Sequence, residues 1–386
     1  MNKIIEENKE WIDSTWEKLE KKLSRTAIKS RGKLPYTTKD GVHNDTAECT
    51  YKPNALPWWT NGFWPGMMWL MYEATGNEEF RKTAEISEEK MDGAFAQYKD
   101  LHHDVGFMWH IMSGASYRLT GNQKSCTRNL FAASVLSSRY NIDGDFIQAW
   151  DWGYQTCSII DSMMNLPLLY WASREVDNPR FKRIAMRQAD MTMRDHIRRD
   201  GSVYHVVSHE TEKVGVVDYP LTQGYDANTS CWSRGLAWAI YGFILSYIHT
   251  EKKEYLDTAI KTANFFITNC SKTDYLPLVD FRAPKEPVYY DSVAGVCAAC
   301  GMLEIAKHVS ECEADVYVDA AIKILKAIDT NWCNYEEDED AIVMMGTELY
   351  PHEERQMKGV HIPMIYGDFF FVEALCKLKG RDFLIW

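Results

Sequence analysis

Apolar residues recur with a period near 3.6 along most of the chain, and stretches of strand-like alternation are short. The segment from Glu7 to Leu23 carries a clear apolar stripe of this kind, which is repeated over 180–194, 253–269 and 315–329. A stripe with this period is the mark of a helix that buries one face. The pattern therefore predicts a chain built mainly of helices, about ten to twelve of them.

An aromatic residue followed four positions later by alanine recurs after polar turns. The four pairs are Phe80/Ala84, Phe181/Ala185, Tyr255/Ala259 and Tyr317/Ala321. Residues four apart lie on one face of a helix, so each pair marks a helix that restarts after a turn. This indicates stacked helical hairpins, although the irregular spacing of the pairs does not fit a short-repeat solenoid.

Two segments interrupt the helical pattern. Residues Gly201 to Val207 are typical of one strand of a β-hairpin, and Leu276 to Asp291, with three prolines, is typical of a long loop. No Pro-, Ser- or Gly-rich linker divides the chain. The sequence therefore predicts a single all-α domain over residues 1–386, with short β-hairpin and loop excursions.

Composition and charge exclude several classes of protein. The chain has 386 residues, of which 46% are hydrophobic and 13% aromatic, and this excludes a disordered chain. Its formal net charge of −12 argues against a nucleic-acid partner. The same charge repels anionic ligands at long range, so an acidic substrate has to be held by local groups.

Membrane insertion and secretion are not indicated either. The longest strongly apolar run, from Leu236 to Ile248, is broken by Gly242 and Ser246 and is shorter than the ~18 residues of a membrane span. The N-terminus turns acidic before a signal-peptide core forms, and the ten cysteines lie mostly in apolar segments. We expect a cytoplasmic protein with reduced cysteines; the alternative is a periplasmic protein whose leader has been removed.

The best-known phosphate, dinucleotide, serine-hydrolase and zinc-protease motifs are absent from the sequence. Cys297 and Cys300 form a lone CxxC inside an apolar run, which is typical of core packing rather than of zinc binding. The acidic run 336–340 is typical of a solvated loop. We therefore predict neither a metal nor a cofactor.

Two carboxylates stand out from this background. Asp104 follows His102 and His103; these adjacent histidines could bind a metal, but neighbours on one chain point in different directions and share an ion poorly. The cluster is either a structural loop or a place where Asp104 lines a pocket. Asp161 lies among Ile, Met and Leu residues, where poor solvation would raise a carboxyl pKa, as a general acid requires. The alternative for Asp161 is a buried helix cap.

Tryptophans beside turn residues form three clusters, at 58–66, 148–153 and 232–238. A single such tryptophan is most simply explained by packing, but three clusters favour platforms for sugar rings. Together with two carboxylates in a helical chain, they indicate a glycosidase.

These clusters, in this order, resemble the unsaturated glucuronyl hydrolases of glycoside hydrolase family 88. The resemblance runs from Trp59 to about Leu375 and rests on the segments 102–107, 160–169, 232–243, 280–291 and 366–369. It implies an (α/α)6 barrel of six helical hairpins, with the site at the end where the loops between helices gather. It also implies hydrolysis of lyase-generated oligosaccharides by protonation of C4 of a 4,5-unsaturated uronic acid and addition of water at C5.

The resemblance assigns roles to individual residues. It makes Asp161 the general acid and base, Asp104 a second, orienting carboxylate, and Trp59 and Trp150 the lining of the sugar site. The residues that it matches to contacts with the unsaturated uronate are His205, Gln223, Arg234 and Trp238. We expect Arg234 to counter the uronate carboxylate, because a planar guanidinium is always charged and suits bidentate contact.

Substrate choice is less well defined by the sequence. Lys358, beside Gly359, resembles the lysine with which some relatives accept sulfated disaccharides, but Glu353 replaces the expected serine and would repel a sulfate. An unsaturated oligosaccharide is the partner we expect. The alternatives are a family 105-type unsaturated rhamnogalacturonyl hydrolase, or a non-catalytic carbohydrate-binding protein on the same barrel, against which the presence of both Asp104 and Asp161 speaks.

Overall fold

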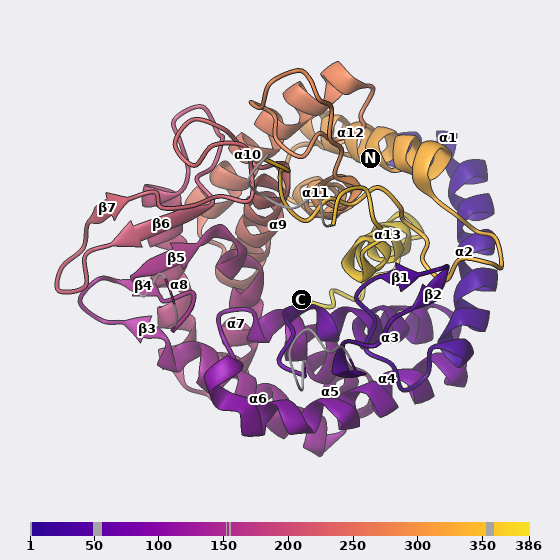
Figure 1. Cartoon of the computed structure of the whole chain (residues 1–386), viewed down its shortest axis with the longest axis horizontal. Helices are drawn as coiled ribbons and strands as arrows, with labels where there is room; N and C mark the ends of the chain where they lie inside the picture. Colours follow the sequence, from indigo (N-terminus) through magenta and orange to yellow (C-terminus); the bar gives the residue numbers. More distant parts are fainter. Residues whose placement is uncertain (1, 49–55, 152, 154–155, 353–358) are drawn as a thin grey trace.

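The computed structural model describes residues 2–48, 56–151, 153, 156–352 and 359–386. Thirteen α-helices lie in this part of the chain, and the longer ones form two concentric layers around a central axis (Figure 1). The inner layer comprises α3 (Phe63–Thr75), α5 (Ala115–Thr120) with the preceding π-helix η4 (Gly106–Gly114), α7 (Leu166–Glu175), α9 (Ser233–Thr250), α11 (Ser292–Ile305) and α13 (Ile365–Leu378). The outer layer comprises α2 (Lys9–Lys29), α4 (Glu78–Lys90), α6 (Gln123–Ser138), α8 (Pro179–Asp195), α10 (Lys253–Cys270) and α12 (Glu311–Trp332), and the short α1 (Asn2–Glu7) precedes α2.

The inner layer closes on itself. Helix α13 packs against both α11 and α3, and the ring continues through η4, α7 and α9 back to α11. Each inner segment also packs most extensively against one outer helix, with α2 pairing with α13 across the two ends of the chain. The predicted (α/α)6 barrel of six helical pairs is confirmed.

Burial distinguishes the two layers. Every residue of α11 is buried, as expected of a helix surrounded by others, whereas α8 buries one face and exposes the other. The four aromatic–alanine pairs all lie on outer helices and are buried, from Phe80 and Ala84 on α4 to Tyr317 and Ala321 on α12. The repeat seen in the sequence therefore marks the face that each of these outer helices turns toward the inner ring.

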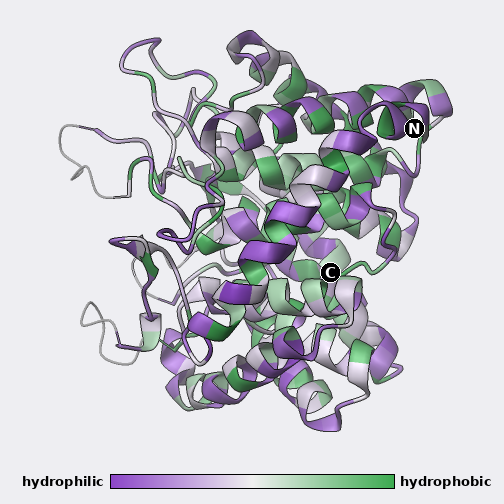
Figure 2. Ribbon diagram, turned by 90° about the vertical axis from the view of Figure 1, so that its right-hand side faces the viewer, coloured by the Kyte–Doolittle hydropathy of each residue, from purple (hydrophilic) through white to green (hydrophobic). Residues whose placement is uncertain are grey.

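Short and long connections alternate around the barrel. Inner helices α3 and α5 end at Gly76 and Gly121, both with positive φ, and the chain turns at once into an outer helix. The connections from outer to inner helices are much longer and cover 30–62, 91–105, 139–165, 196–232, 271–291 and 333–364. They gather at one end of the barrel, where Figure 2 shows the irregular segments on one side of the helices. Each of them leads into the N-terminus of an inner helix.

Short strands stiffen some of these connections. They are β1 (Thr38–Lys39) with β2 (Val42–His43), β3 (Tyr140–Asn141) with β4 (Phe146–Ile147), and a sheet of β5 (Cys157–Ile159), β6 (Val206–His209) and β7 (Val216–Asp218), all antiparallel. The strand expected over 201–207 begins later, at Val206, and pairs on both sides. The loop expected over 276–291 is free of helix and strand, as predicted, and carries one isolated bridge between Leu278 and Tyr290 and another from Asp280 to Trp232.

Aromatic side chains fill the barrel axis. Trp386 is 2% exposed and stacks on Phe370 of α13, with ring planes 9° apart. It also contacts Phe107 of η4 and Tyr241 of α9, so the last residue joins three inner segments. In Figure 1 the C-terminus accordingly lies near the centre of the ring. None of the helices described is both long and apolar enough to cross a membrane.

Candidate active site

The long loops bring the predicted carboxylates together at the N-terminal ends of neighbouring inner helices. Asp104 lies two residues before η4, and Asp161 lies in the 3-10 helix η5 (Ile160–Asn165) that leads into α7. Arg234 is the second residue of α9, and Trp59 begins the 3-10 helix η2 (Trp59–Gly62) before α3. Since η4, α7 and α9 are adjacent in the ring, residues distant in sequence converge on one end of the barrel.

Asp104 is enclosed by protein. Only 6% of the residue is exposed, and its Oδ1 accepts a hydrogen bond of 3.1 Å from Asn165 Nδ2 and lies 3.2 Å from His103 Nε2. Burial, and then the negative charge of Asp161, raise the pKa of the Asp104 carboxyl well above its usual value. The two carboxylates thus interact electrostatically.

The histidines before Asp104 both face its carboxylate. His103 Nδ1 lies 2.9 Å from the Ala149 carbonyl, to which it donates, so Nε2 presents its lone pair to Asp104. Burial lowers the pKa of His103 well below its usual value. His102 Nδ1 lies 3.4 Å from Asp104 Oδ2, on the other side. One possible ligand atom from each of the three residues lies within 4.8 Å of the other two. The sequence predicted that these neighbouring side chains would point in different directions. They converge because residues 103–104 form a turn.

Asn165 connects the two carboxylate-bearing segments, and sequence reasoning missed it. Its Nδ2 donates to Asp104 Oδ1 and, at 3.2 Å, to the main-chain carbonyl of Asp161, while its Oδ1 accepts from Phe107 N at 2.8 Å. A Cβ on Gly106 would lie 2.6 Å from Asn165 Oδ1, so a glycine is needed for this close approach. The one available clue is that Asn165 follows Asp161 by four residues, one helical turn later.

Asp161 faces a different set of groups. Its apolar neighbours Ile160 and Met163 are fully buried in the core, whereas its own side chain is 15% exposed, compared with 9% for Asp104. The more enclosed of the two carboxylates is therefore Asp104. Asp161 Oδ2 lies 3.3 Å from Nε2 of His205.

The imidazole of His205 is oriented by its other nitrogen. The main-chain N–H of Gln223 donates to His205 Nδ1 at 2.9 Å, so the neutral ring carries its proton on Nε2, toward Asp161. The ring also lies 4.4 Å from that of Trp232. Gln223, expected to contact the substrate, thus reaches the site through its backbone by orienting His205.

Arg234 is 2% exposed and largely occupied within the protein. Its Nε lies 3.3 Å from Asp291 Oδ2, and its terminal nitrogens donate to the Tyr366 hydroxyl and to the carbonyls of Thr347 and Glu348. The pair with Asp291 offsets part of the cost of burying the charge. Contact between Arg234 and a substrate carboxylate stays a prediction.

The predicted sugar-contacting tryptophans occupy different depths. Trp59 is half-buried, with its ring 4.8 Å from Tyr366 and 5.6 Å from Phe107. Trp150 is also half-buried and meets His103 edge-on at 5.5 Å. Trp238 is 1% exposed and packs beneath Phe107 at 5.4 Å, one turn deeper along α9 than Arg234. Lys358 lies outside the described residues.

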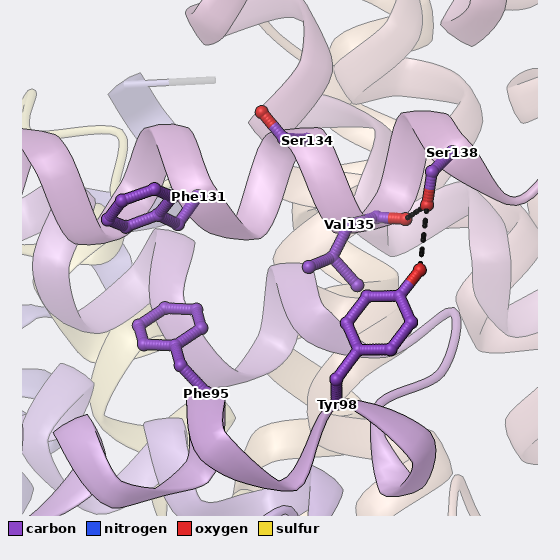
Figure 3. A pocket seen from close by; sticks show the side chains of 6 residues that line it. All are labelled: Phe95, Tyr98, Phe131, Ser134, Val135 and Ser138. Carbon is purple, nitrogen blue, oxygen red and sulfur yellow. Dashed lines mark hydrogen bonds between the residues drawn. The ribbon is translucent and has the colours of Figure 1, made fainter.

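A shallow groove on the outer surface offers no comparable chemistry. It lies between the 3-10 helix η3 (Met91–Asp100) and α6 and has a volume of about 390 Å³ (Figure 3). Its lining residues are Phe95, Tyr98, Phe131, Ser134, Val135 and Ser138. None of these six is a carboxylate, histidine or cation, so the groove is not a candidate for catalysis.

Two interacting carboxylates at the loop end of a double helical barrel define a glycosidase-like protein. Comparison with known proteins specifies which kind. Residues 35–245, more than half of the chain, match the profile of Glycosyl Hydrolase Family 88. The unsaturated glucuronyl hydrolase of Bacillus sp. strain GL1 is 32% identical over 83% of this chain and 86% of its own length. The unsaturated chondroitin disaccharide hydrolase of Streptococcus pneumoniae is 30% identical over 85% of this chain and 83% of its own length.

Solved structures agree. The crystal structure of the Bacillus sp. GL1 enzyme superposes with a TM-score of 0.85 at 29% identity, covering 95% of this chain and 97% of that one. An unsaturated glucuronyl hydrolase specific for heparin gives a TM-score of 0.83 at 27% identity, covering 96% and 97%. The chain belongs to glycosyl hydrolase family 88 and is a glycosidase of the unsaturated glucuronyl hydrolase type.

Proposed function

We propose that this enzyme removes the 4,5-unsaturated uronic acid from the non-reducing end of glycosaminoglycan-type disaccharides produced by lyases, with Asp161 and Asp104 as its working carboxyl groups. The observation that carries the proposal is the pair itself: both carboxylates lie at the loop end of the barrel and are linked through Asn165. Relatives named for unsaturated chondroitin disaccharides and for heparin support the substrate class. A solved structure that is 29% identical to this chain, of an Asp-to-Asn variant with dGlcA-Glc-Rha-Glc, supports an oligosaccharide with a terminal uronate, although its sugars are not those of a glycosaminoglycan disaccharide.

The proposed reaction begins at the double bond rather than at the anomeric carbon. The carboxyl group of Asp161 delivers a proton to C4, and the positive charge develops at C5, where the ring oxygen stabilises it. A water molecule adds to C5 and gives its proton to the Asp161 carboxylate, which is thereby restored. The resulting hemiketal opens to a C5 ketone, and the hemiacetal left at C1 releases the second sugar. One carboxyl group serves as acid and then as base.

The surroundings of Asp161 suit this task. Its Oδ2 faces the N–H of His205, which leaves Oδ1 for proton exchange with the substrate. Asp104, held through Oδ1 by Asn165, is assigned the role of orienting the substrate or the attacking water. Holding the acid and its acceptor in a fixed relative orientation can contribute a large part of the rate enhancement.

Binding of an acidic sugar to an acidic protein needs local compensation. The buried guanidinium of Arg234 supplies a positive charge at the same end of the barrel, next to Tyr366. Trp59, beside Tyr366 and Phe107, and Trp150, beside His103, are both half-buried, and their faces are suited to cover the sugar rings.

The proposal is tested by following loss of the ultraviolet absorbance of the conjugated double bond. The purified chain is incubated with unsaturated disaccharides from chondroitin, hyaluronan, heparin and pectin. We expect turnover of glycosaminoglycan disaccharides, and no turnover by Asp161→Asn. Turnover of pectin fragments alone would instead indicate a rhamnogalacturonyl-type activity, and no turnover of any substrate would refute the proposal.

A further inference from the structure

We propose that His102, His103 and Asp104 form a binding site for Zn²⁺, and that zinc bound there inhibits the hydrolase. Nothing in the family resemblance or in the comparisons assigns a metal to these residues. The proposal rests on the convergence of their side chains in the turn that precedes η4.

The distances suit a tetrahedral ion. Zinc bonds to imidazole nitrogen and carboxylate oxygen are about 2.0–2.2 Å long, so two ligand atoms of a tetrahedral site lie about 3.4 Å apart. His103 Nε2 lies 3.2 Å from Asp104 Oδ1, and His102 Nδ1 lies 3.4 Å from Asp104 Oδ2. All three ligand atoms already lie within 4.8 Å of one another. Both nitrogens would reach one ion if the His102 ring gave up the weak bond of 3.4 Å that its Nδ1 accepts from the Asp104 N–H and the carboxylate turned from Asn165.

The structure also holds His103 in the form that a metal needs. Its Nδ1–H is bonded to the Ala149 carbonyl at 2.9 Å, which leaves the Nε2 lone pair facing Asp104. Metal-binding histidines generally have such a partner on the second nitrogen, which fixes the tautomer and the ring orientation. The Trp150 ring, perpendicular to the imidazole at 5.5 Å, restricts its rotation further.

The donor set selects the class of metal. Two imidazole nitrogens and one carboxylate suit zinc, whereas magnesium and calcium prefer oxygen ligands. Three protein ligands leave a fourth position for water or for an oxygen of a ligand. Because Asp104 would be committed to the ion, zinc should compete with its role toward the substrate; this step rests on the proposed function, whereas zinc binding does not.

The experiment uses the untagged full chain, freed of metal with a chelator that is then removed. Zinc binding is measured by isothermal titration calorimetry, and inhibition by the absorbance assay with an unsaturated chondroitin disaccharide. We expect one zinc per chain, inhibition that a chelator reverses, and no inhibition by magnesium at the same concentration.

His102→Gln, at the least buried ligand, and Asp104→Asn should each weaken zinc binding at least about tenfold. His308→Gln, which removes an exposed histidine after α11, is the matched control and should bind zinc like wild type.

The outcomes separate the site from the function. Failure of the wild-type chain to bind zinc stoichiometrically, or unchanged affinity in His102→Gln and Asp104→Asn, would overturn the site. Zinc binding without inhibition would overturn the inhibitory role. If the protein turns over no substrate yet shows the predicted pattern of zinc affinities, the site stands and the proposed function fails.

Discussion

At the scale of single residues, the two carboxyl groups of the site differ in their surroundings. Asp104 is fixed by Asn165 and faces two histidines, whereas Asp161 is more exposed and faces the N–H of His205. A carboxyl group that exchanges protons with substrate and water has to reach both, which suits the more exposed one. A group that orients has to be held still, which suits the enclosed one.

Asp161→Asn should therefore abolish most of the activity while keeping the fold. An amide of the same shape can neither deliver nor accept the proton, and loss of general acid–base catalysis typically costs ~10²–10⁴-fold in rate. The initial rate with an unsaturated chondroitin disaccharide measures this, with circular dichroism as the check on folding. Asp329→Asn, at a carboxylate on α12 that binds Trp11, is the matched control and should keep the wild-type rate. A variant at position 161 that retained more than about a tenth of the rate would contradict the assignment.

Asn165→Ala should lower the rate because it frees both carboxylate segments. The variant loses the hydrogen bond to Asp104 Oδ1 and the one to the Asp161 carbonyl, and hydrogen bonds to charged groups contribute about 1.5–3 kcal/mol. We expect kcat to fall roughly 10- to 100-fold. Asn129→Ala removes another fully buried asparagine, which contacts His110 away from the carboxylates. Both variants should lose stability, but only Asn165→Ala should lower kcat strongly. A similar fall in kcat in Asn129→Ala would show that Asn165 affects the rate only by stabilising the fold.

At the scale of elements, buried carboxylates connect the long loops to the inner helices. Asp368, in the first turn of α13, accepts the main-chain N–H groups of Ile342 and Val343 from the loop that follows α12. Burial raises the pKa of Asp368 to about 7 despite these hydrogen bonds, which lower it. The connection therefore depends on pH.

The sign of this dependence follows from linkage. In the unfolded chain Asp368 ionises near pH 4, whereas in the folded chain it keeps its proton until about pH 7. The folded state binds the extra proton within this window, so its contribution to the free energy of unfolding falls as pH rises from about 4 to 7, by at most about 4 kcal/mol. Asp368→Asn should lack this decline while keeping an oxygen acceptor. Urea unfolding of both proteins across the window measures the difference, and parallel curves would contradict it.

Sequence reasoning succeeded where structure is set by local periodicity. The helices over 180–194, 253–269 and 315–329 follow from their apolar stripes, and α8, α10 and α12 match these ranges closely. The sequence did not predict contacts that form only when the ring of inner helices closes. Asn165 bridges to Asp104 because loops far apart in sequence meet at one barrel end, and no local pattern encodes that meeting. The convergence of His102 on Asp104 depends instead on the turn at 103–104, which the sequence did not predict.

At the scale of the whole molecule, the barrel depends on its filled axis. Trp386 stacks on Phe370 and donates to Glu373, and it contacts side chains of three inner segments. The family resemblance predicted the barrel, but neither it nor the apolar pattern predicted that this residue fills the centre, because a single terminal tryptophan shows no periodicity.

Trp386→Ala should destabilise the protein by about 3–5 kcal/mol, because it opens a cavity among inner helices that cannot all move inward. Phe131→Ala removes an aromatic ring that is 58% exposed and should cost less than about 1 kcal/mol. Chemical unfolding of the two variants beside wild type gives both values. Similar small losses in both would show that the axis is not a critical part of the core.

Hydration of a double bond, rather than displacement at the anomeric carbon, is the reaction that we propose for this family 88 enzyme. It is tested most directly by running the reaction on an unsaturated chondroitin disaccharide in D₂O and examining the uronate product by NMR. We expect one deuteron at C4, a keto carbon at C5 and loss of the double bond at the rate of sugar release. A released uronic acid that still carries its C4–C5 double bond, with no deuterium at C4, would contradict it.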